Sequence, residues 1–487
     1  MQSDEAMSVP AASPRLFPAM LDRLPGDIGR PRYDRAAQRN GIVHFGIGAF
    51  HRAHQAVYTE DAMNAGDRDW GIVGVSLRSA AVRNQLVPQA GLYSLVQRDA
   101  GGDAVRIAGA VRDVLVGPQH AAGIVAAIAS PYTRILSFTI TEKGYHRALG
   151  GGLDLEDPAI IADAGGTTAP ATIYGFIRAA LSERRAAGLP GLTLISCDNL
   201  AGNGAVLERC LRAFLEIAEA PLARWFDEEC SCPSTMVDRI VPATTEADLA
   251  ALADRYGVYD AAAVVAEPFR QWVIEDRFVT SRPRWEIGGA TFVSDANAYE
   301  LVKLRLLNGT HSALAYLGLS AGHRFVHEAI ADPAIRYTVD RLMREAAATL
   351  QPIPDFDVTA YCSRLLERFS NTRLPHSLAQ IAMDGSQKLP QRWFATLSDA
   401  ARQGWRCPAL LESLAAWVRF VRGDWFEVVD PHAAELKAHW WKYGADGISA
   451  SLFGNNGLFA ATWPADAESL ETLRTALAKS VPTSARP

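Results

Sequence analysis

Apolar residues in the first half of the chain occur in short uninterrupted runs, separated by segments of helical spacing. Runs of this length that end in glycine or polar residues are typical of parallel strands buried on both faces. The predicted strands cover 41–48, 70–77, 132–141 and 192–199, and the predicted helices between them cover 49–66 and 171–188. Strands that alternate with helices predict a parallel sheet with right-handed crossovers.

From about residue 292 the pattern changes to long segments rich in alanine and leucine with helical spacing. These segments cover 299–322, 333–350, 357–369, 408–422, 431–442 and 465–480. A chain of 487 residues is too long for a single hydrophobic core. We therefore predict an α/β domain over 1–291, followed by a mostly α-helical domain over 292–487. Residues 1–38 form a weakly patterned extension predicted to lie over a surface, and the last seven residues, "VPTSARP", are predicted to fray.

Composition and charge exclude several classes of protein. The net charge is −6, and lysines and arginines are scattered, which gives no nucleic-acid footprint. No apolar window reaches the length of a membrane span, and the first residues contain no secretory apolar region. Of the six cysteines only Cys230 and Cys232 lie close together, without zinc-site spacing. We expect a cytoplasmic protein with reduced thiols and no bound metal.

The stretch "GIVHFGIGAFHRAHQ" places two glycines, Gly46 and Gly48, between a predicted strand and a predicted helix. Such a turn brings the backbone close to a pyrophosphate, and the helix N-terminus that follows favours its charge. The third glycine of the usual fingerprint is replaced by His51. We predict a Rossmann-type domain that binds NAD or NADP. The predicted cofactor-binding residues are Gly46, Ile47, Gly48, Ala49, Phe50 and Arg78.

The choice between the two cofactors stays open in the sequence. No acidic residue follows the second predicted strand in "GVSLRSAAVR", where an acid would bind the ribose hydroxyls of NAD. Arg78 and Arg83 could instead meet the additional phosphate of NADP, or they could lie at a solvated helix start.

The stretch "KLRLLNGTHS", residues 303–312, places polar side chains in a leucine-rich helix. At about 100° per residue, Glu300, Lys303, Asn308 and His311 fall within one half of the helix surface. A lysine among leucines is a candidate general base, and an asparagine amide can donate to a developing alkoxide. This set would suit metal-free oxidation of a secondary alcohol. The pattern alone favours the simpler interpretation, a helix with one solvent-exposed edge.

Other polar stretches occur at positions typical of ligand sites. Asp198 and Asn199 end a predicted strand in "ISCDNLAGNG", Asp238 lies in the apolar run "PSTMVDRIVPA", and Lys388 follows a turn in "QIAMDGSQKLPQR". Each of these residues alone could be an ordinary cap or ion-pair member.

Seven stretches occur together in one order: "HFGIGAFHRAHQ", "TITEKGY", "SCDNL", "TMVDRI", "EPFRQWVIED", "KLRLLNGTHS" and "MDGSQKLPQR". Over roughly residues 40–430 the chain thereby resembles the mannitol dehydrogenase family of long-chain, zinc-independent polyol and hexuronate dehydrogenases. The resemblance implies a Rossmann-type domain, a helical domain and catalysis in the cleft between them. It implies that Lys303 is the general base, that Asn199 and Asn308 stabilise the oxyanion, that His311 binds substrate and that Glu300 conducts the proton to solvent. The substrate-binding residues that it implies are Asp238, Val237, Lys388, Gln380, Lys143 and His376.

The resemblance also bears on the substrate. Lys143 in "TEKGY" and Gln380 before "MDGSQKLPQR" are more like fructuronate reductases, which interconvert D-mannonate and D-fructuronate, whereas "GVSLRS" is more like the mannitol 2-dehydrogenases. A sugar acid is the preferred substrate, because Lys143 or Lys388 could pair with its carboxylate. Mannitol or another polyol such as arabinitol is the alternative, and a cofactor-binding sensor without catalysis is a third. We expect a monomer or weak oligomer whose partner is the small-molecule substrate.

Overall fold

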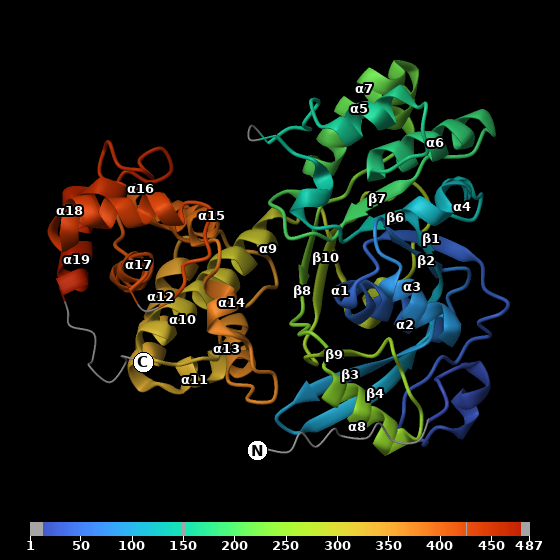
Figure 1. Cartoon of the computed structure of the whole chain (residues 1–487), viewed down its shortest axis with the longest axis horizontal. Helices are drawn as coiled ribbons and strands as arrows, with labels where there is room; N and C mark the ends of the chain where they lie inside the picture. Colours follow the sequence, from blue (N-terminus) through green and yellow to red (C-terminus); the bar gives the residue numbers. More distant parts are fainter. Residues whose placement is uncertain (1–12, 149–150, 425, 479–487) are drawn as a thin grey trace, which may run out of the picture. The chain divides into compact units, whose positions relative to one another are not determined.

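The computed structural model describes residues 13–148, 151–424 and 426–478. The chain divides into two compact units, Met1–Asn297 and Ala298–Pro487 (Figure 1). The first is built around a parallel sheet and the second from helices, so the predicted fold class is confirmed. Within the part of the chain described, no helix is both long enough and apolar enough to cross a membrane.

The first unit contains a five-stranded parallel sheet in the order β5-β2-β1-β6-β7. Its strands are β1 (Asn40–Phe45), β2 (Gly71–Ser76), β5 (Val111–Val116), β6 (Ile135–Phe138) and β7 (Thr193–Ser196). Four of the five were predicted. The sequence of β5, "VRDVLV", has Arg112 and Asp113 in its centre, and this edge strand is only half buried. An edge strand buried on one side lacks the continuous apolar run of a central parallel strand, which is why the pattern missed it.

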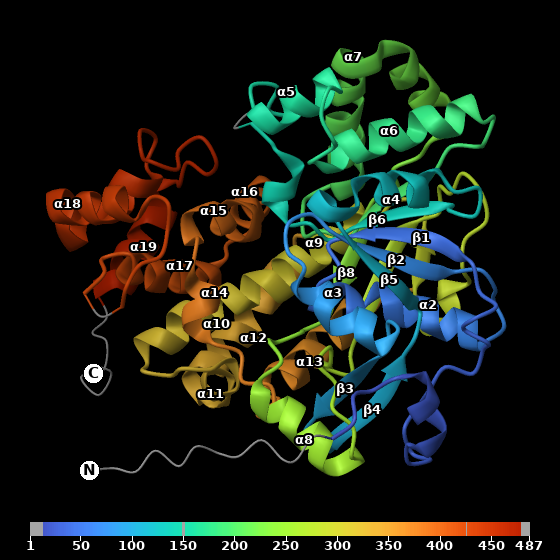
Figure 2. The same cartoon turned by 45° about the vertical axis from the view of Figure 1, so that its right-hand side comes forward.

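Helices cover both faces of this sheet (Figure 2). Val43 and Phe45 of β1 pack against α4 (Gly117–Ala129), α6 (Ile173–Ala186) and α7 (Asn203–Glu229). Ile42 packs on the opposite side with α1 (Ala49–Ala53) and α2 (Gln55–Asn64). The single predicted helix over 49–66 was wrong, because His54 has φ −125° and ψ −90° and separates α1 from α2.

Two small three-stranded sheets complete the first unit, with the strand orders β4-β3-β9 and β11-β10-β8. Their strands are β3 (Tyr93–Asp99), β4 (Gly102–Ala108), β8 (Thr235–Asp238), β9 (Val264–Ala266), β10 (Gln271–Glu275) and β11 (Thr291–Val293). The remaining helical elements are η1 (Pro18–Arg23), α3 (Ala81–Leu86), η2 (Val87–Gln89), η3 (Glu142–Tyr145), α5 (Pro158–Gly165), α8 (Glu246–Tyr256) and η4 (Trp285–Gly288).

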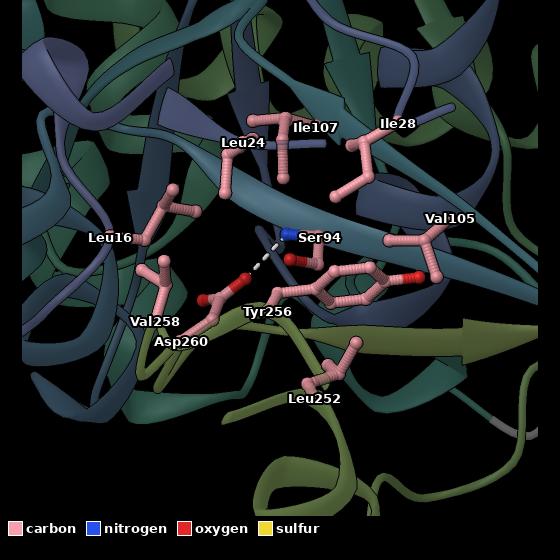
Figure 3. Close-up of a pocket in the computed structure, with 10 residues that line it drawn as sticks. All are labelled: Leu16, Leu24, Ile28, Ser94, Val105, Ile107, Leu252, Tyr256, Val258 and Asp260. Atoms are coloured by element: carbon pink, nitrogen blue, oxygen red, sulfur yellow. Dashed lines mark hydrogen bonds between the residues drawn. The ribbon is translucent and has the colours of Figure 1, made fainter. Parts of the chain in front are cut away.

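Most described residues of the N-terminal extension are exposed or half buried, and the extension is anchored to the first unit by a few buried side chains. Leu16, Leu24 and Ile28 are almost fully buried and pack against Ile107 and Val258. Figure 3 shows the small cavity that these side chains enclose. Its volume of about 10 Å³ leaves room for at most one water molecule, so the cavity is a packing defect and not a ligand site.

The second unit is helical throughout its described residues and has one hydrophobic core. Helix α10 (Gly309–Ser320) lies at its centre and packs against α11, α12, α14 and α17. The other elements are α9 (Asn297–Val302), η5 (Lys303–Asn308), α11 (Val326–Ala331), α12 (Pro333–Ala347), α13 (Val358–Phe369), α14 (Leu378–Ala382), α15 (Gly385–Leu389), η6 (Pro390–Phe394), α16 (Ala395–Arg402), α17 (Pro408–Phe420), α18 (Ala433–Phe453) and α19 (Ala467–Ala478).

The prediction of one regular helix over 299–322 was wrong in an important detail. The chain is α-helical in α9 and α10, but the six residues of η5 between them form a π-helix, closed by a hydrogen bond from the Gly309 N–H to the Leu304 carbonyl. Short π-helical segments are rare and occur frequently at functional sites. The frayed tail predicted for "VPTSARP" lies outside the described residues.

Candidate functional site

The glycine turn lies where the strand order of the parallel sheet reverses. Strands β2 and β5 extend from one side of β1, whereas β6 and β7 extend from the other. Open α/β sheets bind ligands at this switch point, beyond the carboxyl ends of the strands. Gly46 follows β1 with φ +92°, and a Cβ atom there would lie 2.0 Å from the Thr139 carbonyl oxygen after β6. Only glycine therefore fits at this position.

Gly48 differs from Gly46 because the space around it is open. It is exposed, and the nearest atom to a Cβ at this position would be the Gly46 carbonyl oxygen, 3.8 Å away. The following residues Ala49 and Phe50 begin α1 and are half buried, while Ile47 is buried beneath the turn. The turn thus combines a sterically fixed residue with exposed backbone that a pyrophosphate could approach.

A pair of stacked histidines supports the turn from inside. His51, at the third fingerprint position, stacks on His44 of β1 with ring centroids 3.4 Å apart. His44 in turn hydrogen-bonds the hydroxyls of Ser137 and Thr139, at 2.8 and 2.9 Å. Burial lowers the pKa of His44 to about 3 and the pKa of His51 well below its usual value. Both rings are therefore neutral near pH 7, and they fill the place that a third glycine would leave open.

The two arginines after β2 have different surroundings. Arg83 forms an ion pair with Asp113 at 3.3 Å and donates to the Val114 carbonyl. Arg78 is exposed, and the described residues give it no ion-pair partner. Of the two cations considered for the phosphate of NADP, only Arg78 is thus open to a ligand.

The loops after β6 and β7 are tied together by Asp198. Its buried carboxylate accepts hydrogen bonds from the backbone N–H groups of Ile140 and Thr141, at 3.1 and 2.9 Å, and from the Tyr145 hydroxyl at 2.8 Å. Burial raises its pKa. Asp198 is therefore a structural link rather than an exposed ligand-binding carboxylate. Asn199, the next residue, is exposed, as is Lys143 on η3.

The carboxyl ends of β1, β6 and β7 thus bring Gly46, Lys143 and Asn199 to the same edge of the sheet, since these strands are parallel neighbours. Val237 and Asp238 belong instead to the small sheet of β8, paired with Trp272 and Gln271 of β10, and both are buried.

In the second unit, η5 and the start of α10 carry the predicted catalytic residues. Lys303 and Asn308 are half buried at the two ends of η5, His311 is buried in the first turn of α10, and Glu300 is half buried on α9. The His311 ring lies 5.4 Å from that of His376, nearly perpendicular to it. The structure therefore places His376 beside His311, which the sequence analysis had singled out.

Several polar atoms of this group are buried without a hydrogen-bond partner among the described residues. They are Asn308 Oδ1, His311 Nε2 and His376 Nδ1. Buried polar atoms normally have a partner, and losing one costs about 1–3 kcal/mol. These three atoms all belong to residues of the predicted site, where a bound ligand or water would supply the missing hydrogen bonds.

Three cationic side chains, Arg368, Arg392 and Lys303, lie near enough to His311 to influence its pKa. Burial lowers this pKa well below its usual value, and His376, Arg368, Arg392 and Lys303 lower it further. His311 is therefore a neutral hydrogen-bonding group near pH 7.

The two other residues predicted in this unit lie on short helices. The ammonium of Lys388, on α15, donates to the Met383 carbonyl at 2.6 Å. Gln380, on α14, is exposed.

Arg392 is a candidate that the sequence reasoning missed. It lies on η6 and donates to the Asn308 carbonyl at 3.3 Å and to the Ser312 hydroxyl at 2.9 Å. Burial lowers its pKa to about 10. In the sequence, Arg392 could have been noticed by its place in "KLPQR", four residues after Lys388. It was missed because arginine side chains are usually exposed to solvent.

Models of two known domain families match most of the chain. A model of the mannitol dehydrogenase Rossmann domain matches residues 40–287, and a model of the mannitol dehydrogenase C-terminal domain matches residues 295–479. The chain belongs to the mannitol dehydrogenase family. It is thus an oxidoreductase of a family that acts on secondary alcohols.

Relatives in this family carry different substrate names. D-mannonate oxidoreductase of Escherichia coli (strain K12) is 42% identical over 456 residues, which are 91% of this chain and 93% of that protein. Mannitol 2-dehydrogenase of Pyrenophora tritici-repentis is 38% identical and matches 96% of this chain and 84% of that protein. The solved ternary complex of Pseudomonas fluorescens mannitol 2-dehydrogenase with NAD and D-mannitol is 37% identical, with a TM-score of 0.84 over 97% of this chain and 98% of that one. The resemblance to the family is confirmed, and the family alone leaves the substrate open.

Proposed function

We propose that this family member catalyses hydride transfer between a nicotinamide dinucleotide and the secondary alcohol of a sugar acid, interconverting D-mannonate and D-fructuronate. The carrying observation is the set of cationic side chains near His311, which are Arg368, Arg392 and Lys303. Positive charge around a hydrogen-bonding site favours a carboxylate substrate over a neutral polyol. The similarity to D-mannonate oxidoreductase supports the same choice.

The proposed cofactor is NAD or NADP, bound at the glycine turn by Gly46, Ile47, Gly48, Ala49 and Phe50, with Arg78 beside it. The exposed backbone at Gly48 fits a pyrophosphate. When bound, the nicotinamide supplies the hydride acceptor for oxidation and the hydride donor for reduction. The open side chain of Arg78 is compatible with a phosphate on the ribose.

In the proposed mechanism, Lys303 accepts the proton of the substrate hydroxyl, while the hydride leaves the carbon that bears this hydroxyl and passes to the nicotinamide. Asn199 and Asn308 donate hydrogen bonds to the oxygen as negative charge develops there. His311, being neutral, hydrogen-bonds the substrate, and Glu300 passes the proton from Lys303 to solvent. The residues proposed to bind the hydroxyl and carboxylate groups of the substrate are Asp238, Val237, Lys388, Gln380, Lys143 and His376.

Alanine substitution at the two glycines separates the two roles of the turn. Gly46→Ala is expected to lower the melting temperature and abolish cofactor binding, because its Cβ would collide with Thr139. Gly48→Ala is expected to leave the melting temperature unchanged and to weaken cofactor binding, because its Cβ would occupy open space beside the turn. Thermal unfolding and fluorescence titration with NADH and NADPH measure both quantities. Wild-type cofactor affinity in Gly48→Ala would place the pyrophosphate elsewhere.

Chelators are expected to leave activity unchanged. Across the described ranges, no three His, Cys, Asp or Glu side chains gather as metal ligands. The proposed mechanism assigns proton transfer and charge stabilisation to side chains. Turnover is measured before and after dialysis against EDTA. Loss of turnover that Zn²⁺ restores would contradict the proposed mechanism.

The charge of the substrate is tested at Lys143, which is exposed at the carboxyl end of β6. Lys143→Met is expected to reduce kcat/KM for fructuronate by about 1.5–3 kcal/mol, the value of a charge-assisted hydrogen bond, and to leave fructose reduction nearly unchanged. Arg185→Met, which removes an exposed charge at the far end of α6, is the matched control.

Parallel kcat/KM measurements on fructuronate and fructose separate the candidate substrates. An equal loss on both would make Lys143 a structural or cofactor-binding residue. If the wild-type enzyme strongly prefers fructose, the sugar-acid proposal is wrong and the protein is a mannitol 2-dehydrogenase. The similarity to the Pyrenophora tritici-repentis and Pseudomonas fluorescens enzymes favours this alternative.

A further inference from the structure

Arg305 lies inside η5, two positions after Lys303 and three before Asn308. Side chains two positions apart on a helix do not face each other, so Arg305 and Lys303 point in different directions. Arg305 is buried, with 4% of its surface exposed. It donates to the carbonyl and to the hydroxyl of Thr349, at 3.2 and 2.6 Å, and pairs with the carboxylate of Asp399.

These partners come from two other segments of the same unit. Thr349 lies just beyond the end of α12, and its hydroxyl also donates to the Ala346 carbonyl. Asp399 lies on α16 and also binds the exposed Arg402. The guanidinium of Arg305 therefore connects the π-helical segment to the end of α12 and to α16. A charge-assisted pair with further hydrogen bonds fixes direction as well as distance.

A π-helical segment differs in register from the α-helices that flank it. It contains one residue more per turn than the α-helices that flank it, and an α-helical repacking of the same sequence would rotate Lys303 relative to Asn308 and His311. The almost fully buried guanidinium of Arg305 pairs with the half-buried carboxylate of Asp399, and removal of Asp399 would leave a buried positive charge without its counter-ion. The anchor thus selects one register of the segment.

We propose that Arg305 is a positioning residue, which holds η5 in its π-helical register and thereby fixes the relative directions of Lys303, Asn308 and His311. The inference rests on the proposed function, in which Lys303 is the general base. Arg305 itself touches neither substrate nor cofactor in this proposal. A displacement of about 1 Å in a catalytic group can lower turnover by about 100-fold.

The test compares Arg305→Met and Arg305→Lys with Arg402→Met. The control removes Arg402, the other arginine that binds Asp399. The side chain of Arg402 is 78% exposed and lies outside η5, on α16. Arg305→Met is expected to lower kcat about 100-fold, with KM changed much less, and to displace the pH profile of kcat. Arg305→Lys is expected to recover part of the loss, because lysine keeps the charge but not the two-pronged geometry. Arg402→Met is expected to keep wild-type kcat and pH profile.

Folding is controlled by normalising kcat to the fraction that binds cofactor and by thermal unfolding. If Arg305→Met fails to fold, Arg305→Lys and Thr349→Val carry the test, because both remove hydrogen bonds and leave no uncompensated charge. A folded Arg305 variant with wild-type kcat and an unshifted pH profile would overturn the proposal, whatever its melting temperature. A loss of activity that equals the loss of folded protein would do the same.

Added guanidinium provides an independent check on a folded Arg305→Ala variant. An open pocket of about 320 Å³ lies beside Arg305 and is lined also by Thr349, Gln351 and Asp399. We expect millimolar guanidinium to restore part of kcat in this variant and to leave the wild type unaffected; absence of any recovery would count against the proposal. If Lys303→Ala keeps its turnover, the proposed function fails at the base itself. If Lys303→Ala is inactive while the Arg305 variants are fully active, only the positioning proposal fails.

Discussion

Lys303→Ala is expected to lower kcat for alcohol oxidation by about 10²- to 10⁴-fold, the range for loss of a positioned general base. Lys303 begins η5, and its charge lies close enough to His311 to lower the pKa of that ring. Cofactor affinity should stay near the wild-type value, because the predicted cofactor residues all belong to the other compact unit. Single-turnover kinetics with saturating cofactor measure the chemical step.

Two further observations strengthen this test. Small primary amines should restore part of the lost rate, because they supply the missing base, and the wild-type oxidation rate should rise with pH through one ionisation that the variant lacks. Lys437→Ala, an exposed lysine on α18, is the matched control and should behave as wild type. Turnover of Lys303→Ala near the wild-type rate would remove this lysine from the mechanism.

Asn308→Asp is expected to produce the second large effect, a loss of about 10²- to 10³-fold in kcat, as for removal of one oxyanion-hole donor. The substitution keeps the shape of the side chain but replaces a hydrogen-bond donor by a negative charge beside the developing oxyanion. Asn308 closes η5, and its Oδ1 atom is buried without a partner among the described residues. Steady-state kinetics in both directions measure the loss.

The control for this substitution is Asn297→Asp, an exposed asparagine at the start of α9. It makes the same chemical change in the same part of the chain and should leave kcat unchanged. If Asn308→Asp raised KM but preserved kcat, Asn308 would bind the ground state of the substrate and not the oxyanion.

The sequence predicted the elements whose pattern is simple and local. The strands β1, β2, β6 and β7 are continuous apolar runs, because both faces of a central parallel strand are buried. The edge strand β5 was missed because Arg112 and Asp113 interrupt its pattern. The break at His54 and the π-helix of η5 were missed because both keep apolar residues at near-helical spacing, while the backbone changes direction or register.

The candidate site was predictable where the residue type itself carried the signal. Gly46, Lys303 and His311 are unusual for their apolar surroundings, so they could be singled out from the sequence. Arg392 and Arg305 could not, because their roles depend on partners far along the chain, such as Ser312 and Asp399. Asp198 was expected near the ligand and is instead a link between loops, because its hydrogen bonds to Ile140 and Thr141 become visible only in the fold.

In acid, the folded protein binds fewer protons than the unfolded chain, because its buried histidines stay neutral. The pKa of His44 is lowered to about 3, those of His51 and His311 well below the usual value, and that of His376 is also lowered. Because the unfolded chain binds these protons near pH 6.5 and the folded chain binds them only at lower pH, each histidine leaves stability intact above pH 6.5 and lowers it as the pH falls toward the pKa of the folded state. The contributions of these histidines have the same sign and add to one another, so stability falls more steeply in acid than a single group would cause. The acid limit of the enzyme should therefore be set by cooperative unfolding with uptake of several protons, at a pH where its surface carboxylates are still ionised.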